Sequence, residues 1–269
     1  INPAGSHVRT TLYKWCSPNG THTKGVLAGY RADLPGDESR LSVSLLVTSV
    51  NNNTVANQTW RHLSDVWTAN ATRTDIGHAS VSQLPSGNIL FAFKQHDGVD
   101  VEYTRYRIGL SESDDGGYNW KMLGVTSLKE PEEFPTGLWH PFLRIAKNGT
   151  VQVFYSGKNQ ASNQGINLRW FNDLGHTWSA PVVVTGVADK LDDKVHVSPG
   201  MPAMKELMYV LTQLSTTTVA HVTSYDDGFT WSGRDFFYVH PGANGTSAST
   251  PQIINTGKTI IFSVMADDA

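Results

Sequence analysis

The sequence predicts an all-β protein, a β-propeller of four-stranded antiparallel blades, because two repeats run through it in phase. The first repeat has the pattern Asp-x-Gly-x-x-Trp and occurs at residues 115–120, 173–178 and 226–231. The second is a hairpin pattern in which apolar or alternating runs flank a turn, at residues 81–93, 142–155 and 251–264, with a weaker copy at 201–211. One unit therefore holds an inner hairpin and an outer strand pair, about four strands in roughly 50–60 residues, which is typical of a propeller blade.

We expect a single propeller domain over residues 1–269, with blades near residues 25–67, 78–125, 139–185 and 197–240 and a partial blade at 250–269. The first blade is degenerate, since Asn51-Asn52-Asn53 stands where the others have Asp-x-Gly, and residues 8–15 would form an outer strand that closes the ring. An incomplete ring leaves unpaired sheet edges, which are unfavourable. We therefore expect that the natural chain continues past Ala269, or that a second chain or another segment completes the propeller.

The composition excludes several classes of protein. Eight Trp, ten Phe and nine Tyr supply ample surface to bury, which argues against disorder. No stretch approaches the roughly 18 apolar residues of a membrane span, so we expect no membrane insertion. The 21 basic and 24 acidic residues leave no positive surplus for binding nucleic acid. A lone cysteine, Cys16, excludes a disulfide scaffold and a cysteine-based zinc site.

Asn-x-Ser/Thr sequons are more frequent than chance would give at this content of serine and threonine. They occur at Asn19, Asn52, Asn57, Asn70, Asn148 and Asn244. Each lies beside turn-forming residues, where a glycan would be carried on the surface. We therefore expect a secreted, extracellular glycoprotein, and the alternative is a set of accidental sequons on a cytosolic protein.

The Asp-x-Gly-x-x-Trp repeat predicts a turn with a structural role. Its glycine can adopt positive φ, and its aspartate can accept hydrogen bonds from nearby backbone N–H groups. The tryptophan can pack across the turn and hold the two strands together. We therefore expect the aspartates and tryptophans to be structural residues on the outer rim: Asp115, Trp120, Asp173, Trp178, Asp226 and Trp231.

These turns resemble the Asp boxes (BNR repeats) of the sialidase superfamily. Further segments resemble the fungal secreted glycoside hydrolases of the exo-arabinanase type and their sialidase-like relatives: 75–82 (DIGHASVS), 137–143 (GLWHPFL), 153–156 (VFYS), 200–203 (GMPA) and 250–268. The resemblance covers the chain from about residue 70 to its end, with a weaker match near 8–12. It implies a six-bladed propeller with its sugar site in the central funnel.

The resemblance does not extend to the catalytic acids. Where the enzymes have a general acid/base glutamate in a segment like GLWEPFL, this chain has His140, and Thr212 or Gln213 occupies the place of their nucleophilic glutamate. Hydrolysis of a glycosidic bond needs two carboxyl groups, about 5.5 Å or 6.5–9.5 Å apart. Sialidases instead use a tyrosine nucleophile with a glutamate partner and an arginine triad. No tyrosine–glutamate pair falls at a matching place, although arginines are available at Arg9, Arg31, Arg73 and Arg105.

Neutral and basic residues at the ends of predicted inner strands are the candidates for ligand binding: His78, Gln95, Trp139, His140, Lys158, Thr212 and Gln213. An indole or imidazole can stack on a sugar, and an amide can bond its hydroxyls, whereas a lysine would suit an acidic ligand. The alternatives are a packed tryptophan with a hydrogen-bonded histidine, polar strand ends facing solvent, and an ordinary solvated lysine. A metal site made by the histidines has no motif, and we expect neither a metal nor a cofactor.

We predict a lectin that binds terminal saccharides of glycans or glycoproteins in the funnel without hydrolysing them. The alternative function is an active secreted exo-acting glycoside hydrolase with relocated acids. Asp75 and Glu132 are the reserve catalytic candidates. Glu132 lies with Glu130 and Glu133 in an acidic cluster, and the alternative interpretation is that this cluster is a run of charges on the surface. A third class is a purely structural or protein-binding propeller, since fold alone does not fix function.

Overall fold

The computed structural model describes residues 5–16, 22–36, 38–51, 54–99, 102–129, 137–159, 163–173, 175–185, 208–213, 218–239, 248–255 and 259–266. All regular secondary structure in these ranges is β-strand, as predicted. The strands form five antiparallel sheets, in which each strand pairs with the next one along the chain. Within the same ranges, no helix is long and apolar enough to span a membrane.

Three of the sheets have four described strands each. Sheet 1 contains β1 (Gly5–Cys16), β2 (His22–Leu34), β3 (Glu38–Asn51) and β4 (Thr54–Asn70). Sheet 2 contains β5 (Thr74–Gln83), β6 (Ile89–Val99), β7 (Glu102–Ser113) and β8 (Lys121–Lys129). Sheet 3 contains β9 (Leu138–Ile145), β10 (Val151–Asn159), β11 (Asn163–Phe171) and β12 (Val182–Thr185).

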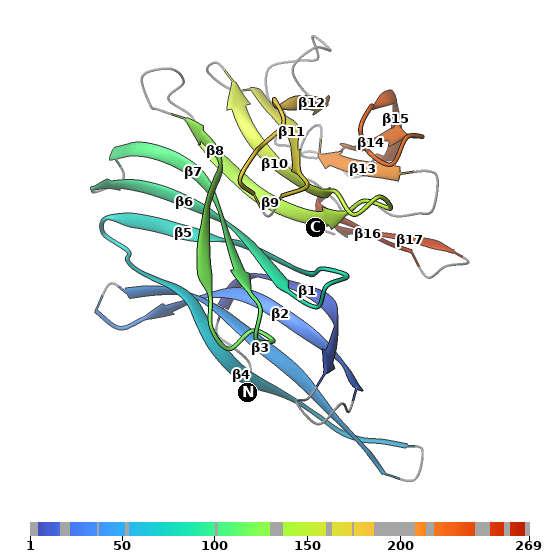
Figure 1. Cartoon of the computed structure of the whole chain (residues 1–269). Helices are drawn as coiled ribbons and strands as arrows, with labels where there is room; N and C mark the ends of the chain where they lie inside the picture. Colours follow the sequence, from blue (N-terminus) through green and yellow to red (C-terminus); the bar gives the residue numbers. More distant parts are fainter. Residues whose placement is uncertain are drawn as a thin grey trace.

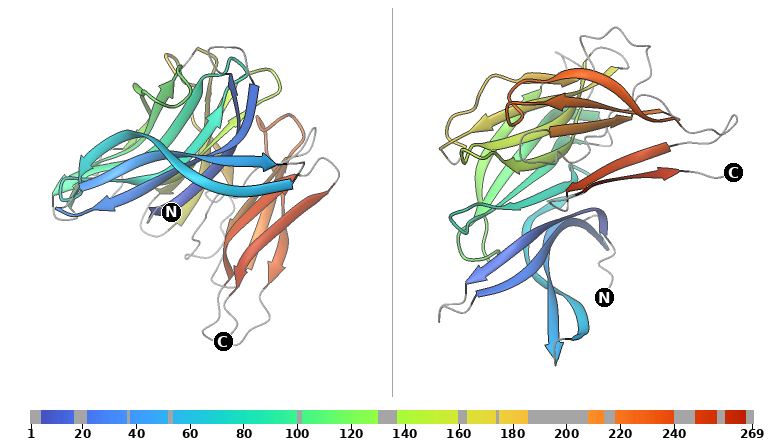
Figure 2. Two further views of the ribbon diagram at one scale, coloured as in Figure 1. Left: turned by 90° about the horizontal axis from the view of Figure 1, so that it is seen from below. Right: turned by 90° about the vertical axis from the view of Figure 1, so that its right-hand side faces the viewer.

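The other two sheets have fewer described strands. Sheet 4 contains β13 (Met208–Gln213), β14 (Thr218–Ser224) and β15 (Ser232–Val239), and sheet 5 contains β16 (Ala248–Asn255) and β17 (Ile260–Ala266). The sheets follow one another face to face in chain order (Figures 1 and 2). The first strands of neighbouring sheets lie against each other, β1 with β5 and β5 with β9, which places them at the centre of the arrangement.

The hydrophobic core is divided into layers between successive sheets. Strand β6 shows why, since its run Ile89–Phe93 is fully buried on both faces. Successive side chains of a strand point to opposite faces. Accordingly, Phe91 and Phe93 pack with sheet 1, while Leu90 and Ala92 pack with sheet 3. A third layer lies between sheets 3 and 4.

The tryptophan of each Asp-x-Gly-x-x-Trp turn joins the layer between its own sheet and the preceding one. Trp120 packs against the same layer as Leu63 of sheet 1, and its Nε1 donates to Ser64 Oγ at 2.9 Å. Trp178 packs against the layer between sheets 2 and 3, and Trp231 meets Phe154 of sheet 3 edge to face at 5.8 Å. The tryptophans therefore join neighbouring sheets, beyond the predicted role of holding together the two strands that flank each turn.

The first segment of the chain lies in a different place from the one expected. Residues 8–15 form a strand, but this strand pairs with β2 along nearly its whole length and is the first strand of sheet 1. Sheet 1 thus spans residues 5–70, where the sequence suggested a blade at 25–67 and a separate closing strand. The apolar alternation of this segment predicts a strand but does not identify its neighbour, and pairing with the next segment is the common outcome in sheets.

Candidate functional site

His78 and His140 occupy equivalent β-bulges near the start of two central strands. In β5, His78 and Ala79 together oppose Phe93, and in β9, His140 and Pro141 together oppose Tyr155. Both histidines have positive φ, 53° and 52°. This left-handed conformation costs roughly 1–2 kcal/mol for a residue with a side chain. Bulges commonly re-aim a side chain beside a functional site, and backbone strain of this kind concentrates there.

The two imidazoles are in direct contact. Their centroids are 4.0 Å apart with an interplanar angle of 23°, so the rings are stacked. The backbone N–H of His140 donates to Nδ1 of His78 at 3.1 Å. Because Nδ1 accepts this bond, the neutral His78 ring carries its proton on Nε2. In this tautomer His78 has no lone pair on Nε2 to offer to a metal ion.

Side chains of sheet 2 fix the backbone of β9 on both sides of this stack. Nε2 of His96 donates to the carbonyl oxygen of Leu138 at 2.7 Å, and Ser80 Oγ accepts from the N–H of Leu143 at 3.0 Å. The His96 ring also meets Trp139 edge to face at 5.5 Å. Burial, together with the charge of Lys94, lowers the pKa of His96 to about 4. His96 is therefore neutral at physiological pH and acts as a fixed support for Trp139 and His140.

Asp75, at the start of β5, is held by ion pairs. Its Oδ1 accepts from Arg31 Nη1 at 2.9 Å, and its Oδ2 accepts from Lys94 Nζ at 2.5 Å and from the Tyr103 hydroxyl at 3.3 Å. Burial raises the pKa of this carboxyl, but Lys94 and Arg31 outweigh that effect and the pKa is lowered. A glycosidase general acid needs a raised pKa. The environment of Asp75 therefore opposes that role.

Gln95 and Lys94 are both buried in the strand that pairs with β5. The pKa of Lys94 is lowered by burial, although Asp75 opposes this. Gln95 is only 4% exposed, so it is part of the sheet interior and not a strand end facing solvent. Its Nε2 donates to Asp97 Oδ1 at 3.2 Å, while its Oε1 has no hydrogen-bond partner within the described part of the chain.

The structure thus brings four of the predicted residues to one end of sheets 2 and 3: Asp75, His78, Trp139 and His140. Lys158, Thr212 and Gln213 lie in β10 and β13, but their side chains are outside the described residues, as are Glu130, Glu132 and Glu133. Asn70 and Asn148 are exposed, the side chain of Asn57 is not described, and three sequons fall outside the described residues: Asn19, Asn52 and Asn244.

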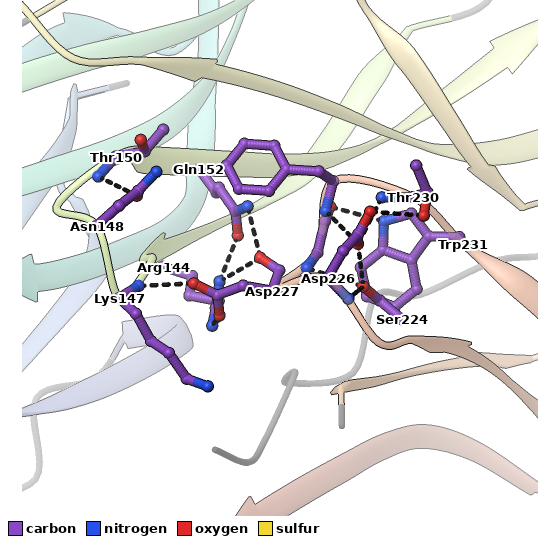
Figure 3. Close-up of polar contacts among 12 residues, drawn as sticks. Arg144, Lys147, Asn148, Thr150, Gln152, Ser224, Asp226, Asp227, Thr230 and Trp231 are labelled. Carbon is purple, nitrogen blue, oxygen red and sulfur yellow. Dashed lines mark hydrogen bonds and ion pairs between the residues drawn. The ribbon is translucent and has the colours of Figure 1, made fainter. Parts of the chain in front are cut away.

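The three repeated turns share one hydrogen-bond pattern. In the first, Asp115 Oδ1 accepts from the backbone N–H groups of Tyr118 and Asn119 at 3.0 Å each, and Trp120 Nε1 donates to the Gly117 carbonyl at 3.2 Å. All three corresponding bonds are present around Asp226. Around Asp173, Oδ1 accepts from the backbone N–H of Thr177, Trp178 Nε1 donates to the Gly175 carbonyl, and the N–H of His176 donates to the backbone carbonyl of Asp173. Figure 3 shows Asp226 beside Ser224, Thr230 and Trp231. These carboxylates are engaged with their own turns.

Sequence reasoning missed the residues that support the site, namely Lys94, His96 and Tyr103, and it noted Arg31 only as one of several arginines. One feature of the sequence pointed to two of these residues. Lys94 and His96 continue an uninterrupted apolar run in the centre of a predicted blade, where a charged side chain requires a buried partner. Within the described residues, no group of three or more His, Cys, Asp or Glu is placed to hold a metal ion.

Comparison with solved structures relates this arrangement to known proteins. An α-L-arabinanase from Penicillium chrysogenum, complexed with arabinobiose, is similar with a TM-score of 0.63 and 18% identity, over 99% of this chain and 78% of the other. The chain folds as a β-propeller. A mutant α-L-arabinofuranosidase from Fusarium graminearum, in complex with an iminosugar inhibitor, is similar with a TM-score of 0.63 and 17% identity. The match again covers 99% of this chain and 78% of the other. No family model and no curated protein matches the sequence.

More distant propellers are also similar. A thermostable family-43 glycoside hydrolase has a TM-score of 0.54 and 11% identity, over 94% of this chain and 81% of the other. A microbial sialidase, Hadza Hz136, has a TM-score of 0.50 and 14% identity, over 97% of this chain and 53% of the other. At these identities the similarity establishes the propeller fold.

Proposed function

We propose that this propeller is a lectin, which binds terminal saccharides where β5 and β9 begin and does not hydrolyse them. The observation that carries the proposal is the His78–His140 stack. His140 stands where the resembling enzymes have a general acid/base glutamate, and the stack, the bond to His78 Nδ1 and the bulge together fix its position. An imidazole pair beside Trp139 offers stacking surface and hydrogen bonds to a sugar.

The structural neighbours support a carbohydrate ligand. Two of them are described in complex with arabinobiose or an iminosugar inhibitor, and their folds cover 99% of this chain. Their enzymatic activity is a property of those proteins, and we take from them only that the ligand is a sugar. The location at the centre of the propeller is what the family resemblance implies. Such central sites, built on rigid strands with a few convergent polar groups, are common places for ligands.

The state of Asp75 supports binding without cleavage. It is the best placed carboxylate of the described residues near the stack, yet both of its oxygens accept bonds from Arg31, Lys94 and Tyr103. Its lowered pKa keeps it ionised at neutral pH, so it has no proton to give to a leaving group. The alternative, a hydrolase with relocated acids, would have to overcome this electrostatic environment.

We propose a sialidase-like propeller of the Asp-box type with six blades, part of whose ring is completed by another segment or a second chain. The chain would be secreted and glycosylated, like the fungal secreted hydrolases it resembles. The repeated turns around Asp115, Asp173 and Asp226 support the Asp-box type, and the exposure of Asn70 and Asn148 is compatible with glycosylation.

A glycan array, followed by a hydrolysis assay, tests the function. We expect the purified protein to bind a set of terminal saccharides and to release no sugar from arabinan, aryl-arabinosides or sialyl-lactose. Trp139→Ala should abolish binding, whereas Phe236→Ala, at an exposed position on β15, should not change it. Turnover that is lost in Asp75→Asn would support the hydrolase instead, and an array without any hit would support a structural propeller.

A further inference from the structure

The contact between His78 and His140 depends on the protonation state of His78. Nδ1 of His78 accepts the backbone N–H of His140 at 3.1 Å, so this nitrogen must offer a lone pair. An imidazolium carries a proton on both ring nitrogens. Protonation of His78 therefore turns the acceptor into a donor and places two N–H groups against each other, so the bond between β5 and β9 is lost.

This bond supports a strained backbone on both strands. His78 and His140 lie in equivalent bulges and have φ values of 53° and 52°. Such conformations persist only where the surrounding structure holds them. The ring stack adds a second contact between the same residues, and a proton on each ring would bring two like charges to a centroid separation of 4.0 Å. The observed arrangement is therefore that of the neutral pair.

The charged side chains next to the backbone of His78 are paired with one another. Arg31 and Lys94 lie beside Gly77, with their nearest atoms 3.5 and 3.9 Å from the place that a β-carbon of this glycine would take. Both cations share the carboxylate of Asp75, and Arg31 also pairs with Asp33. Among the described residues at this point, the carboxylates are thus already engaged, which disfavours an additional positive charge on His78.

The groups that pack on the other side of the pair keep their charge state at mildly acidic pH. From β6 and β7, His96 contacts Trp139, and Tyr103 and Tyr106 contact His96. Burial, together with the charge of Lys94, lowers the pKa of His96 to about 4, and burial raises the pKa values of both tyrosines. A change near pH 6 therefore does not originate from these groups.

Further charged side chains on the strands that pack against β5 and β9 are in ion pairs of their own: Arg40 with Glu38 and Asp65, Arg107 with Asp97, and Arg144 with Asp227. The side chains of β1 and that of Lys158 in β10 lie outside the described residues.

We infer that the His78–His140 pair is a proton-sensitive switch, which holds the binding site in shape while both rings are neutral and releases it when His78 takes up a proton. Its effect on ligand binding rests on the proposed function. The lectin binds its saccharide at neutral pH and releases it as the pH falls from about 7 to about 5, the range in which imidazoles protonate. A ligand that binds only the neutral pair competes with one proton, so its dissociation constant rises by about tenfold per pH unit once His78 is protonated.

NMR spectroscopy of the full chain tests the switch without any ligand. The ring nitrogens of His78 and the backbone amide of His140 are followed from about pH 7.5 to about pH 5. We expect the His78 proton on Nε2 at the upper end, and a shift of the His140 amide with the same midpoint as the His78 ring. In His78→Asn this amide should not titrate, because asparagine accepts through Oδ1, tolerates positive φ and has no proton to gain. The matched control is His62→Asn, at a side chain that is 53% exposed, and it should behave like the wild type.

Calorimetry with the best glycan from the array then measures affinity at the two ends of this pH range. We expect the dissociation constant to rise about tenfold in the wild type and in His62→Asn. In His78→Asn, which lacks one stacking ring, the affinity should be lower but the same at both ends. An equal wild-type affinity at both ends would contradict the control of binding by the switch.

The two measurements separate this inference from the function on which it rests. A His140 amide that does not follow the His78 ring, or a His78 ring with its proton on Nδ1 at neutral pH, would overturn the switch and leave the lectin function standing. A coupled titration in a chain that binds no glycan would overturn the lectin function and support the switch. The wild-type titration decides the inference even if His78→Asn does not fold.

Discussion

Arg144 of β9 and Asp227, in the turn between β14 and β15, form an ion pair that joins sheets 3 and 4 (Figure 3). Asp227 also accepts from the backbone N–H of Lys147 at 2.6 Å, and its carbonyl oxygen accepts from Arg144 Nη1 and from Gln152 Nε2 at 2.9 Å each. Asp227 has a φ of 62°, and the first repeated turn has a glycine, Gly116, at the equivalent position. Asp227 is therefore held in a strained backbone conformation, and its contacts with sheet 3 offset the free-energy cost of that strain.

Removal of the Asp227 side chain should weaken the fold. In Asp227→Ala the backbone strain remains, while the largely buried Arg144 loses its carboxylate partner and keeps only neutral acceptors. We expect a loss of about 2 kcal/mol in the free energy of unfolding. Asp227→Gly should lose about 1 kcal/mol less, because glycine accepts positive φ. Urea unfolding measures both. Asp114→Ala, at an exposed position of the first turn, is the control, and an alanine variant as stable as the wild type would show that the ion pair contributes nothing.

Acid should weaken the first repeated turn. Burial raises the pKa of Asp115, but hydrogen bonds from Asn119, Ser113 and Tyr118 outweigh it and lower the pKa to about 2, below the ordinary 3.8. A lowered folded-state pKa contributes stability above the unfolded value, and this contribution is lost as the pH falls from about 4 to about 2. Unfolding midpoints measured across this window should fall more steeply in the wild type than in Asp115→Asn. Equal slopes would contradict the hydrogen-bonded carboxylate.

His96 should give a second acid-sensitive step at higher pH. Its pKa is about 4 in the folded chain, compared with 6.5 for an unperturbed histidine. The pKa is lowered chiefly because the folded chain buries the ring. The folded state therefore binds its proton less readily than the unfolded chain. Stability is fully present above pH 6.5 and is lost progressively toward pH 4. The slope of unfolding free energy against pH in this window should be smaller in His96→Gln, and an unchanged slope would exclude His96 as its source.

Asp75 should matter for stability and not for turnover. Asp75→Asn leaves the buried Lys94 and the partly buried Arg31 without their shared carboxylate, and we expect a loss of about 1–3 kcal/mol in unfolding free energy. Asp33→Asn is the matched control, because the Asp33 side chain is 60% exposed although it also pairs with Arg31. Chemical unfolding and a sugar-release assay are run on the same preparations. A stable variant that loses a measurable hydrolase activity would reverse the assignment.

The sequence predicted local features of the fold well. The turns at 113–120 and 224–231, and the hairpins that precede them, depend on neighbouring residues such as Asp115 and Gly117, whose chemistry is visible in the chain itself. The neighbour of β1 was not predictable in this way, because strand pairing is a contact between segments. The same holds for the burial of Gln95, which depends on the packing of whole sheets.

The candidate site was predicted in part. His78, Trp139 and His140 were found because they begin predicted strands, but the bulges at His78 and His140 depend on the register of the partner strand. A weak signal existed for the second bulge, since His140 is followed by proline, which has no N–H to give to a ladder. Lys94 and Asp75 lie on paired strands, and their contact required the register of β5 against β6.

The tryptophans of the repeated turns have a consequence for how the molecule assembles. Trp120, Trp178 and Trp231 each fill a layer shared with the blade before their own. Within the described residues, the blades formed by sheets 1 to 4 therefore share their interiors with their neighbours. A blade excised by itself would expose apolar surface on both faces and lack one indole that its successor supplies. Adjacent blades must therefore gain and lose their structure together, so unfolding of this part of the chain should proceed as one cooperative transition, unlike an array of independent modules.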